Sequence, residues 1–594
     1  MVFVPPSWVP KLAFGKWERT LEAGTPSNDL PDPPDSIPIA EFITTDKYAR
    51  YPLAKSKNPF TCGLTGKTFD WKTFIERQDF LARAIGKRLG WLPNEETEWD
   101  KVACIFSVNT IDYLTISWAI HRLNGIVTPA NAAYSTPELT HQLKSSGAKA
   151  LFVGGPQLQI GLEAAKAAGI PKDKIWLMGM AGFEKADGFV TVEDLIAEGA
   201  KLSPLDALQW TKGQGERQPA FLSYSSGTSG LPKAVMVSHR NVIANAMQHV
   251  AYESVSRKKL GISTQTVLGL LPMSHIYALV VIAHNCIYRG DEVVVLPKFE
   301  MPTYLSAIER FKINHLFLVP PIVIRMTRVP EECKKYNLDS VRVVFSGAAP
   351  LGEETVQDMN KIWPKWRVAQ GYGMTETATI VTSNSEDDIL NKSSGSLLPA
   401  TRAKIFGLDG TEVKGYDTPG ELWVQSPSAT IGYLNNQKAT TETFVFDEDG
   451  RWVRTGDEAV VTLSPLGNEH IVIVDRIKEL IKVKGHQVAP AELEAHLLSH
   501  PAVADCAVIQ VPDDSAGEVP KAFVVKAPAF ADKPEDEVVK AILKHVEEHK
   551  ASYKWIKGGI EFLDVVPKSP SGKILRRLLR DQEKASRTKK GPKL

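Results

Sequence analysis

The sequence predicts an α/β fold with parallel sheets, on three observations. Apolar runs of strand length alternate with stretches of helical spacing, in the order "VACIFSV", "TIDYLTISWAIHRLN", "GIVTPAN", "STPELTHQLKSSG" and "AKALFVG". The chain has 594 residues, of which 43% are hydrophobic, so it can form two or more domain cores. From about residue 403 the pattern changes to shorter strand-like runs, which indicates a second architecture in the same chain.

These shorter runs predict a small, mostly antiparallel subdomain, because Gly, Asp and Pro interrupt them. They are "RAKIFGL", "GELWVQS", "EAVVTLS" and "EHIVIVD". The charge-rich segment "DRIKELIKVKG" follows and ends in glycine, which favours a domain junction. We therefore expect an N-terminal domain over residues 1–477 and a C-terminal domain over residues 478–594.

The predicted C-terminal domain is a small α+β unit of about 110 residues, enough for an independent core. Helical spacing occurs in "APAELEAHLLSH" and "PEDEVVKAILKHVEEH". Strand patterns occur in "AVADCAVIQV", "KAFVVKA" and "IEFLDVV".

Composition excludes several classes of protein. Seventy basic and sixty-nine acidic residues give a net charge of +1, so we expect no nucleic-acid partner. No apolar run approaches the roughly 18 residues of a membrane span, and the first residues do not resemble a signal peptide, so we expect a soluble chain without a transmembrane segment.

The cysteines are odd in number, widely spaced and free of CxxC motifs, which predicts neither disulfides nor a zinc site and favours a reducing compartment. They are Cys62, Cys104, Cys286, Cys333 and Cys506.

The basic tail "KASRTKKGPKL" ends in Pro592-Lys593-Leu594 and allows two interpretations. It is similar to the Ser-Lys-Leu address for import into peroxisomes, with proline at the first place, which would imply a peroxisomal import receptor as partner. It can equally be a solvated tail of a cytoplasmic protein.

The stretch "SYSSGTSGLPK" from residue 223 lies between strand patterns, "PAFLSYS" before it and "AVMVSH" after it. It can be a linker or a loop that holds a phosphate. Its glycines allow successive N–H groups to face an anion, and its hydroxyls and one lysine add donors and charge. It is no Walker loop, because Ala234 follows Lys233 and a strand rather than a helix comes next.

"SYSSGTSGLPKAV" resembles the phosphate-binding loop of the adenylate-forming superfamily, which includes acyl- and aryl-CoA ligases, luciferases and peptide-synthetase adenylation domains. The resemblance extends over residues from roughly 50 to 580 and is closest to the 4-coumarate-CoA ligase and luciferase branch. Its further motifs are "LPMSHIYAL", "FSGAAPLGEE", "QGYGMTET", "GELWVQ", "RTGD", "VDRIKELIKVKGHQVAPAELE" and "PKSPSGKILRR".

The resemblance implies a large N-terminal domain of two α/β subdomains plus the antiparallel subdomain, followed by a mobile C-terminal domain. It also implies an ATP-dependent acid:CoA ligase that forms an acyl-adenylate and then a thioester, with ATP, Mg²⁺ and coenzyme A. Glu376 would hold Mg²⁺, Thr375 would contact the α-phosphate, and Asp457 would accept the ribose hydroxyls beside Arg476. The other residues implied for ATP or AMP are Ser225, Ser226, Gly227, Thr228, Ser229, Gly230, Lys233, Ala348, Gln370, Gly371, Tyr372 and Lys573.

The resemblance assigns the second half-reaction to a rotated C-terminal domain with its hinge at Lys478. Lys482 and Gln487 would then face AMP, while Lys484 and Gly485 would line the path of CoA. Lys573 would serve the first half-reaction, at the α-phosphate and the carboxylate. His275 would orient the acid or gate CoA, although a histidine in an apolar run can also be a core residue.

The acyl pocket that the resemblance implies is apolar and has no basic residue. Its residues are Tyr277, Val281, Phe345, Ala348, Gly371, Thr379 and Ile380. Plant 4-coumarate ligases commonly have Met in place of Phe345 and Pro-Val in place of Thr379-Ile380, so we expect an aryl, cinnamyl or medium-chain acid rather than hydroxycinnamate alone. Residues 251–266 resemble an insertion before the next strand; one interpretation is a surface loop that alters access of CoA or a partner, and the sequence favours no particular role.

Two other hypotheses stay open at this point. The adenylate could pass to a carrier protein or be oxidised, as in luciferases; we favour CoA because we expect no carrier domain after residue 594 and because "KVKGHQV" is complete. A non-catalytic nucleotide-binding relative would retain the fold alone. Against it, the matched positions still hold Lys233, Glu376, Asp457, Lys482 and Lys573.

Overall fold

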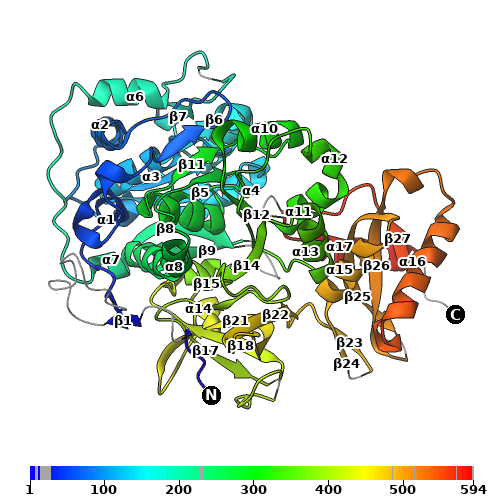
Figure 1. Cartoon of the computed structure of the whole chain (residues 1–594). Helices are drawn as coiled ribbons and strands as arrows, with labels where there is room; N and C mark the ends of the chain where they lie inside the picture. Colours follow the sequence, from blue (N-terminus) through cyan, green and yellow to red (C-terminus); the bar gives the residue numbers. More distant parts are fainter. Residues whose placement is uncertain are drawn as a thin grey trace.

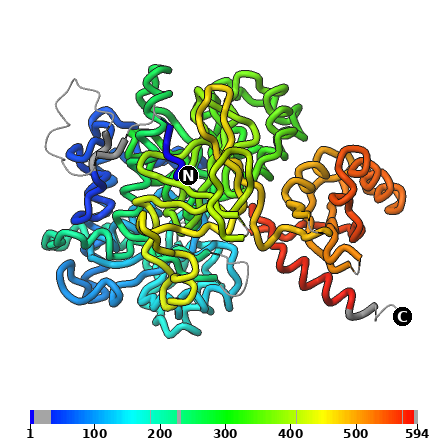
Figure 2. The backbone as a smooth tube through the Cα atoms, turned by 90° about the horizontal axis from the view of Figure 1, so that it is seen from below, coloured from blue at the N-terminus to red at the C-terminus, as the bar shows by residue number. Residues whose placement is uncertain are grey.

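The computed structural model places a large N-terminal part beside a smaller C-terminal part, with a β-sheet layer below the large part (Figure 1). Seen from below, the residues after about 480 gather on one side of the molecule (Figure 2). The structure describes residues 1–6, 11–13, 29–183, 185–225, 232–407, 409–484, 486–513, 515–569 and 572–590.

Two mixed sheets form the large part, and the predicted α/β class is confirmed. The first has the order β16-β15-β14-β13-β12-β10-β11-β3 and is parallel from β14 to β3. Its strands are β3 (Phe60–Cys62), β10 (Thr266–Gly269), β11 (Glu292–Val295), β12 (His315–Leu318), β13 (Val343–Ser346), β14 (Arg367–Met374), β15 (Thr379–Ser383) and β16 (Ser396–Leu397).

The second sheet has the order β19-β9-β8-β5-β4-β6-β7, with antiparallel pairing at its β8-β9-β19 end. All residues of β4, β5 and β6 are buried, as expected for parallel strands covered by helices on both faces. Its strands are β4 (Val102–Phe106), β5 (Ile126–Ala130), β6 (Ala150–Gly154), β7 (Ile175–Met178), β8 (Pro219–Ser225), β9 (Lys233–Ser238) and β19 (Gly432–Tyr433).

The antiparallel sheet below them pairs β17-β18-β21-β20, with β22 on β21. Its strands are β17 (Arg402–Phe406), β18 (Gly420–Gln425), β20 (Phe444–Asp447), β21 (Gly450–Leu463) and β22 (Glu469–Arg476). A short parallel pair, β1 (Lys11–Ala13) and β2 (Asp29–Pro31), lies near the N-terminus.

The C-terminal part has its own sheet and core, as the α+β pattern predicts. The sheet orders β24-β23-β26-β25, and β27 pairs in parallel with β26. Its strands are β23 (Ile481–Val483), β24 (His486–Val488), β25 (Val503–Asp513), β26 (Gly517–Lys526) and β27 (Ile560–Phe562).

Helices cover these sheets, and α8 continues directly from β9. Ser238 and Asn241 cap its N-terminus reciprocally through side chain and backbone. The helices are α1 (Ile39–Thr44), α2 (Trp71–Leu89), α3 (Tyr113–Arg122), α4 (Thr136–Ser146), α5 (Leu158–Ala168), α6 (Val192–Gly199), α7 (Gln214–Arg217), α8 (His239–Lys259), π-helical η7 (Tyr277–Asn285), α9 (Cys286–Tyr288), α10 (Met301–Phe311), α11 (Pro320–Arg328), α12 (Pro330–Cys333), α13 (Glu353–Ile362), α14 (Gln437–Thr443), α15 (Pro490–Ser499), α16 (Glu535–His549) and α17 (Arg576–Lys590).

The interpretation of residues 251–266 as a surface loop is wrong for most of its length. Residues 251–259 are the last turns of α8, and β10 begins at Thr266. Tyr252, Ser256 and Arg257 are buried there. Arg257 donates to both oxygens of Asp291, at 2.9 and 3.0 Å, so one face of the last turns is held by a buried ion pair, while Lys258 and Lys259 are exposed.

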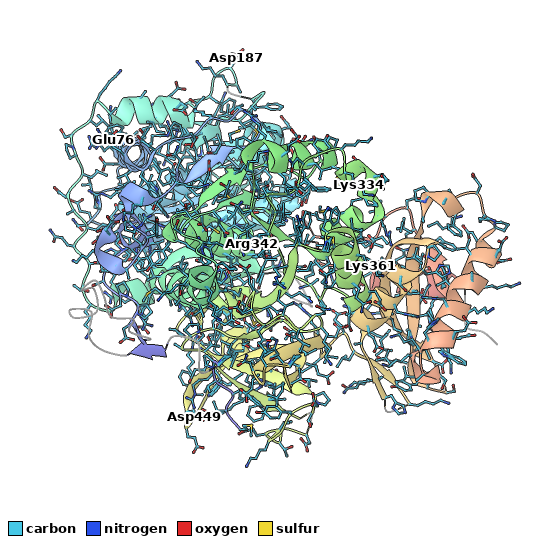
Figure 3. All side chains as sticks on the ribbon, viewed as in Figure 1. Glu76, Asp187, Lys334, Arg342, Lys361 and Asp449 are labelled. Atoms are coloured by element: carbon cyan, nitrogen blue, oxygen red, sulfur yellow. The ribbon has the colours of Figure 1, made fainter. Side chains whose placement is uncertain are left out.

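One hydrophobic core joins the two mixed sheets, because it includes Val127 of β5, Phe221 of β8, Phe317 of β12 and Phe345 of β13. Every residue of η7 is buried. Charged side chains lie on the outline of the molecule, among them Asp187, Lys334 and Asp449 (Figure 3). In the part of the chain that the structure describes, no helix is long and apolar enough to cross a membrane.

Candidate active site

The strands β8 and β9 hold the two ends of the predicted phosphate loop together. Ser225 ends β8, Lys233 begins β9, and the two are cross-strand partners. The bounds of β8 are those of the pattern "PAFLSYS". The Lys233 ammonium lies 5.1 Å from the ring centroid of Tyr433, a cation–π distance.

Glu376 lies in the turn Thr375–Thr377 directly after β14, and its side chain reaches the base of this loop. Its Oε1 accepts hydrogen bonds from the Tyr433 hydroxyl at 2.7 Å and from Ser225 Oγ at 3.2 Å. Sequence reasoning missed Tyr433. It lies in β19, which pairs with β9, and a two-residue strand gives little periodicity from which to predict that placement.

Asp457 and Tyr372 form a second polar cluster. The Tyr372 hydroxyl donates to Asp457 Oδ2 at 2.6 Å, and Arg476 Nε lies 3.7 Å from Asp457 Oδ1. Asp457 and Arg476 face each other across β21 and β22. Burial raises the pKa of Asp457, while Arg476, the Tyr372 hydrogen bond and Lys573 oppose that rise.

The residues expected to frame adenine lie around the end of β14. Gln370 is buried and uses its side chain on the framework: its Oε1 accepts from the Leu351 N–H at 3.0 Å and its Nε2 donates to the Asn391 carbonyl at 2.7 Å. Ala348 is exposed, with φ of 70°. A Cβ on Gly371 would lie 2.4 Å from the Phe345 ring, so a larger residue would require that ring to move.

Lys573 of the C-terminal part lies within the electrostatic reach of this site. Its pKa is lowered to about 8, by burial first and by the charge of Arg476 second, while Asp457, Glu479 and Glu376 act in the opposite direction. The structure therefore brings a lysine from beyond residue 570 to the carboxylates of the large part.

The charge of Lys573 also acts on His275. Its pKa is lowered to about 4 by burial first and by Lys573 second, so the imidazole is neutral at physiological pH. Its Nδ1 accepts from the Tyr277 N–H at 3.3 Å, which places the proton on Nε2. The ring can thus donate one hydrogen bond from Nε2.

The residues predicted for the second half-reaction lie apart from this cluster. Lys482 and Lys484 are exposed, and Lys482 pairs with Gln487 across β23 and β24. The Lys482 N–H donates to Glu518, within the C-terminal part. Lys478 is exposed in the turn that joins β22 to β23.

The residues predicted for the acyl pocket are mostly buried and lie close to one another. The Tyr277 hydroxyl donates to the Phe345 carbonyl at 3.2 Å, and the Thr379 hydroxyl donates to the Ile276 carbonyl at 3.0 Å. Val281 and Ile380 belong to the same core. The Phe345 ring lies edge-on to that of Phe317, with centroids 5.9 Å apart.

Arg328 at the end of α11 connects the large part to the C-terminal part. Its guanidinium donates to the carbonyl of Val503 at 2.7 Å, of Leu498 at 3.2 Å, and of Ala504. Nearby, α13 packs on α15 so closely that a Cβ on Gly352 would lie 3.0 Å from that of Ala495. The C-terminal part makes these contacts in the same arrangement that brings Lys573 to the site.

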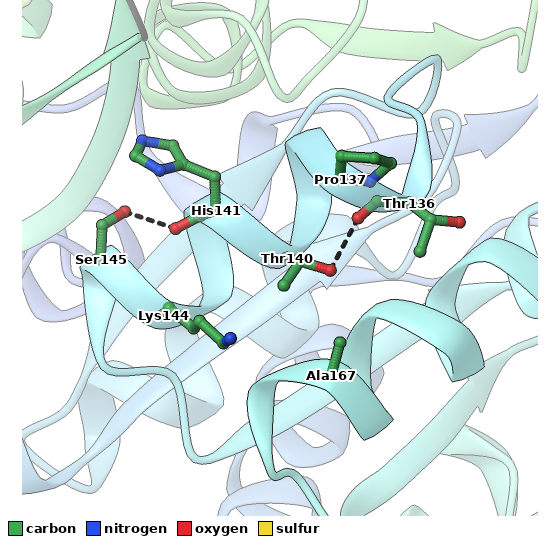
Figure 4. A pocket seen from close by; sticks show the side chains of 7 residues that line it. All are labelled: Thr136, Pro137, Thr140, His141, Lys144, Ser145 and Ala167. Atoms are coloured by element: carbon green, nitrogen blue, oxygen red, sulfur yellow. Dashed lines mark hydrogen bonds between the residues drawn. The ribbon is translucent and has the colours of Figure 1, made fainter.

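An open cavity of about 700 Å³ lies elsewhere, along α4 and near the end of α5 (Figure 4). Its walls are held locally, since Thr140 and Ser145 donate to carbonyls of their own helix at 2.7 Å. None of the predicted site residues lines it. The lining residues are Thr136, Pro137, Thr140, His141, Lys144, Ser145 and Ala167.

Several predicted residues lie outside the described part of the chain, and their roles stay predictions. They are Ser226, Gly227, Thr228, Ser229, Gly230, Gly485 and the tripeptide Pro592-Lys593-Leu594.

Two family models match the chain. The model described as AMP-binding enzyme covers residues 57–434, and the model described as AMP-binding enzyme C-terminal domain covers residues 492–573.

Individual proteins match over nearly the whole length. Acyl-CoA ligase easD of Emericella nidulans is 38% identical over 586 residues, which cover 98% of this chain and 100% of that protein. Acyl-CoA ligase AKT1 of Alternaria alternata is 40% identical over 590 residues, covering 98% and 97%. The structure of the anthranilate CoA ligase AuaEII with anthranoyl-AMP shares the fold, with a TM-score of 0.79 and 23% identity over 93% of this chain and 98% of that one.

Proposed function

The chain belongs to the AMP-binding enzyme family and is an AMP-forming acyl-CoA ligase that uses ATP and CoA, and we propose that it activates an aryl, cinnamyl or medium-chain carboxylic acid. One observation supports the roles of its residues above all others. Lys573, from the C-terminal part, is electrostatically coupled to Asp457, Glu376 and His275 of the large part. A cation held among an acid-binding histidine and two carboxylates suits the joining of two anions, a carboxylate and ATP.

In the first half-reaction a carboxylate oxygen of the acid attacks the α-phosphorus of ATP, and the bond to pyrophosphate breaks. Lys573 and Lys233 lower the repulsion between the two anions, because each adds a positive charge where negative charge accumulates. Asp457 accepts the ribose hydroxyls, with Arg476 and Tyr372 holding its carboxylate in place. His275 donates from Nε2 to the acid.

The donors around Glu376 fit a Mg²⁺ ion at its carboxylate. Both described hydrogen bonds end on Oε1, and no described residue donates to Oε2, so a hard oxygen ligand remains available. Mg²⁺ bound there would neutralise charge on the phosphates. Tyr433 and Ser225 hold Glu376 in place through its other oxygen, Oε1.

In the second half-reaction the thiol of CoA attacks the acyl carbonyl, the thiol proton is lost, and AMP leaves. Water must be kept from the adenylate before CoA arrives, which favours two arrangements of the C-terminal part. Lys573 serves the arrangement seen in the structure. We propose that rotation about Lys478 replaces it with the exposed hairpin that carries Lys482, Lys484 and Gln487.

The proposed acid class follows from the walls of the pocket. Tyr277, Val281, Phe345 and Ile380 offer aromatic and aliphatic surface, and the hydroxyl of Tyr277 is already bonded to a carbonyl. An apolar acyl group would replace water there favourably.

The first experiment incubates the purified protein with Mg-ATP, CoA and a pooled panel of aryl, cinnamyl and fatty acids, followed by mass spectrometry of acyl-CoA and AMP. A thioester with one class of acid supports the proposal and names the acid. AMP-linked acid without thioester would contradict CoA as acceptor and favour a carrier protein or oxidation. A second pool holds dicarboxylic, short-chain and amino acids, and thioesters formed only from this second pool would contradict the acid assignment.

Two variants separate the half-reactions. Lys573→Ala should abolish adenylate formation from free acid and largely spare thioester formation from a supplied acyl-adenylate, whereas Lys482→Ala should show the reverse. Equal loss of both half-reactions in either variant would contradict the division of labour between the two lysines.

A further inference from the structure

Two helices of the C-terminal part bring four histidines together, away from the residues assigned to catalysis. His496 lies in α15 and His500 directly follows it, while His545 and His549 lie in α16. His545 and His549 are four residues apart within α16, so they lie on one side of that helix. The rings of His496 and His545 stack at 4.3 Å with an interplanar angle of 6°, and those of His545 and His549 lie 5.1 Å apart.

Hydrogen bonds determine which nitrogen of three of these rings carries the proton. His549 Nδ1 lies 2.8 Å and His496 Nε2 lies 3.3 Å from the His545 carbonyl, so both nitrogens donate. Ser499 Oγ donates its own proton to the His496 carbonyl at 2.7 Å, which leaves it to accept from His545 Nε2 at 3.1 Å.

An imidazole that donates from one nitrogen and carries no second proton keeps a lone pair on the other, which here is Nδ1 of His496, Nδ1 of His545 and Nε2 of His549. A histidine that binds a metal typically donates its remaining N–H to a carbonyl or another oxygen, which fixes the orientation of the ring. These three rings have that second interaction already, two of them with a backbone carbonyl.

We propose that His496, His545 and His549 bind a divalent transition-metal ion of the Zn²⁺ type. One ring nitrogen from each lies within 4.8 Å of the other two. Ligands of tetrahedral Zn²⁺ are about 3.3 Å apart at Zn–N distances of about 2.0–2.1 Å, so binding requires the three nitrogens to move closer. The parallel rings of His496 and His545 must also turn out of their stack, because an imidazole binds a metal in the plane of its ring. Three imidazoles suit Zn²⁺, Ni²⁺ or Cu²⁺ better than Mg²⁺ or Ca²⁺, which prefer oxygen.

The charges near the site allow a cation. Lys550 follows His549 in sequence, and its ammonium is paired with Glu492 at 3.1 Å. Glu354 of α13, across the contact between α13 and α15, exerts a favourable field at His496. A bound ion would link α15 to α16, and α15 is also the helix on which the large part packs.

The test uses the full chain without a polyhistidine tag, with Co²⁺ alone as the probe, because Zn²⁺ is spectroscopically silent. We expect one equivalent of Co²⁺ per chain, with visible absorption of tetrahedral cobalt that Zn²⁺ displaces. His549→Gln and His545→Gln should each weaken Co²⁺ binding at least about 10-fold. His141→Gln, on α4, is the matched control and should bind like the wild type.

His549 is exposed, so its substitution decides the question even if His545→Gln does not fold. As a second measurement, Zn²⁺ should raise the Tm of the wild type and not that of His549→Gln. Equal Co²⁺ binding by wild type and His549→Gln, or no tetrahedral absorption at all, would overturn the proposal. Because neither measurement uses activity, the result is independent of the ligase assignment.

Discussion

At the scale of single residues, the proposed role of Lys573 predicts that the first half-reaction is sensitive to alkaline pH. Its pKa is lowered to about 8, so the folded free enzyme loses this charge as pH rises through about 8, well below the ordinary range for lysine. We expect kcat/KM for adenylate formation to fall over that range, since kcat/KM reports the free enzyme. Lys573→Arg should move the fall to higher pH, because arginine stays charged. An identical profile for both proteins would rule out Lys573 as the titrating group.

Tyr433 offers a second test at this scale. Tyr433→Phe removes the hydroxyl that donates to the buried Glu376 carboxylate, and a hydrogen bond to a charged group contributes about 1.5–3 kcal/mol. We expect kcat/KM for ATP to fall about 10-fold or more. Tyr416→Phe is the matched control, because Tyr416 also donates to a glutamate, Glu469 at 2.8 Å, but on the surface of the antiparallel sheet. Unchanged or faster adenylation by Tyr433→Phe would show that this contact does not assist catalysis.

At the scale of secondary-structure elements, the end of α11 holds the C-terminal part in the arrangement that presents Lys573. Arg328→Ala removes its three donors to backbone carbonyls. Because the side chain is exposed, we expect a loss on the order of 1 kcal/mol, which is several-fold in the rate of adenylate formation. Thioester formation from supplied adenylate should change little or improve.

Arg325→Ala on the same helix is the control for this prediction, since Arg325 is also an exposed arginine. Measuring both half-reactions in both variants checks it. A similar effect of the two substitutions, or an equal effect of Arg328→Ala on both half-reactions, would contradict a role for Arg328 in the domain arrangement.

The elements also show what could be predicted from the sequence. The strands on each side of the predicted phosphate loop follow from alternating and apolar patterns, which depend on local residues. The last turns of α8 were mistaken for a loop, because their charged residues hide a buried face that becomes visible only when Arg257 meets Asp291. A single sequence carries no periodic signal for pairing between distant segments. The contacts of Tyr433, of Arg328 and of the histidine cluster depend on such pairing, so they could not be predicted.

At the scale of the whole molecule, buried neutral histidines predict loss of stability in acid. Burial lowers the pKa of His121 and His249 to about 3 and of His284 to about 4, and it also lowers those of His239 and His315 well below the ordinary value. The pKa of histidine in the unfolded chain is about 6.5. Below that pH these side chains bind protons in the unfolded chain but stay neutral in the folded chain. The stability present above pH 6.5 is therefore lost as pH falls towards 4.

Each such histidine contributes up to about 1.4 kcal/mol per pH unit over this window. The measurement is the Tm between pH 8 and pH 4, which should be level near neutrality and fall steeply below about pH 6. A Tm that stays constant down to pH 5 would mean that these rings accept protons without leaving their sites.

The location of the whole molecule in the cell is predicted from the C-terminal tripeptide alone. If Pro592-Lys593-Leu594 is a peroxisomal address, removing these three residues from a protein tagged at its N-terminus should disperse a punctate signal in cells. The full-length tagged protein is the control. An unchanged distribution after truncation would favour the interpretation of a solvated tail.

The hydrogen bonds of Arg328 all end on main-chain oxygens, and this has a consequence for exchanging parts between relatives. A side chain that recognises only backbone does not depend on which residues the partner segment carries, as long as that segment folds in the same way. The C-terminal part could therefore be replaced by that of another family member without losing this contact. Arg328 therefore supplies a contact between the two parts that does not depend on the side chains of the C-terminal part.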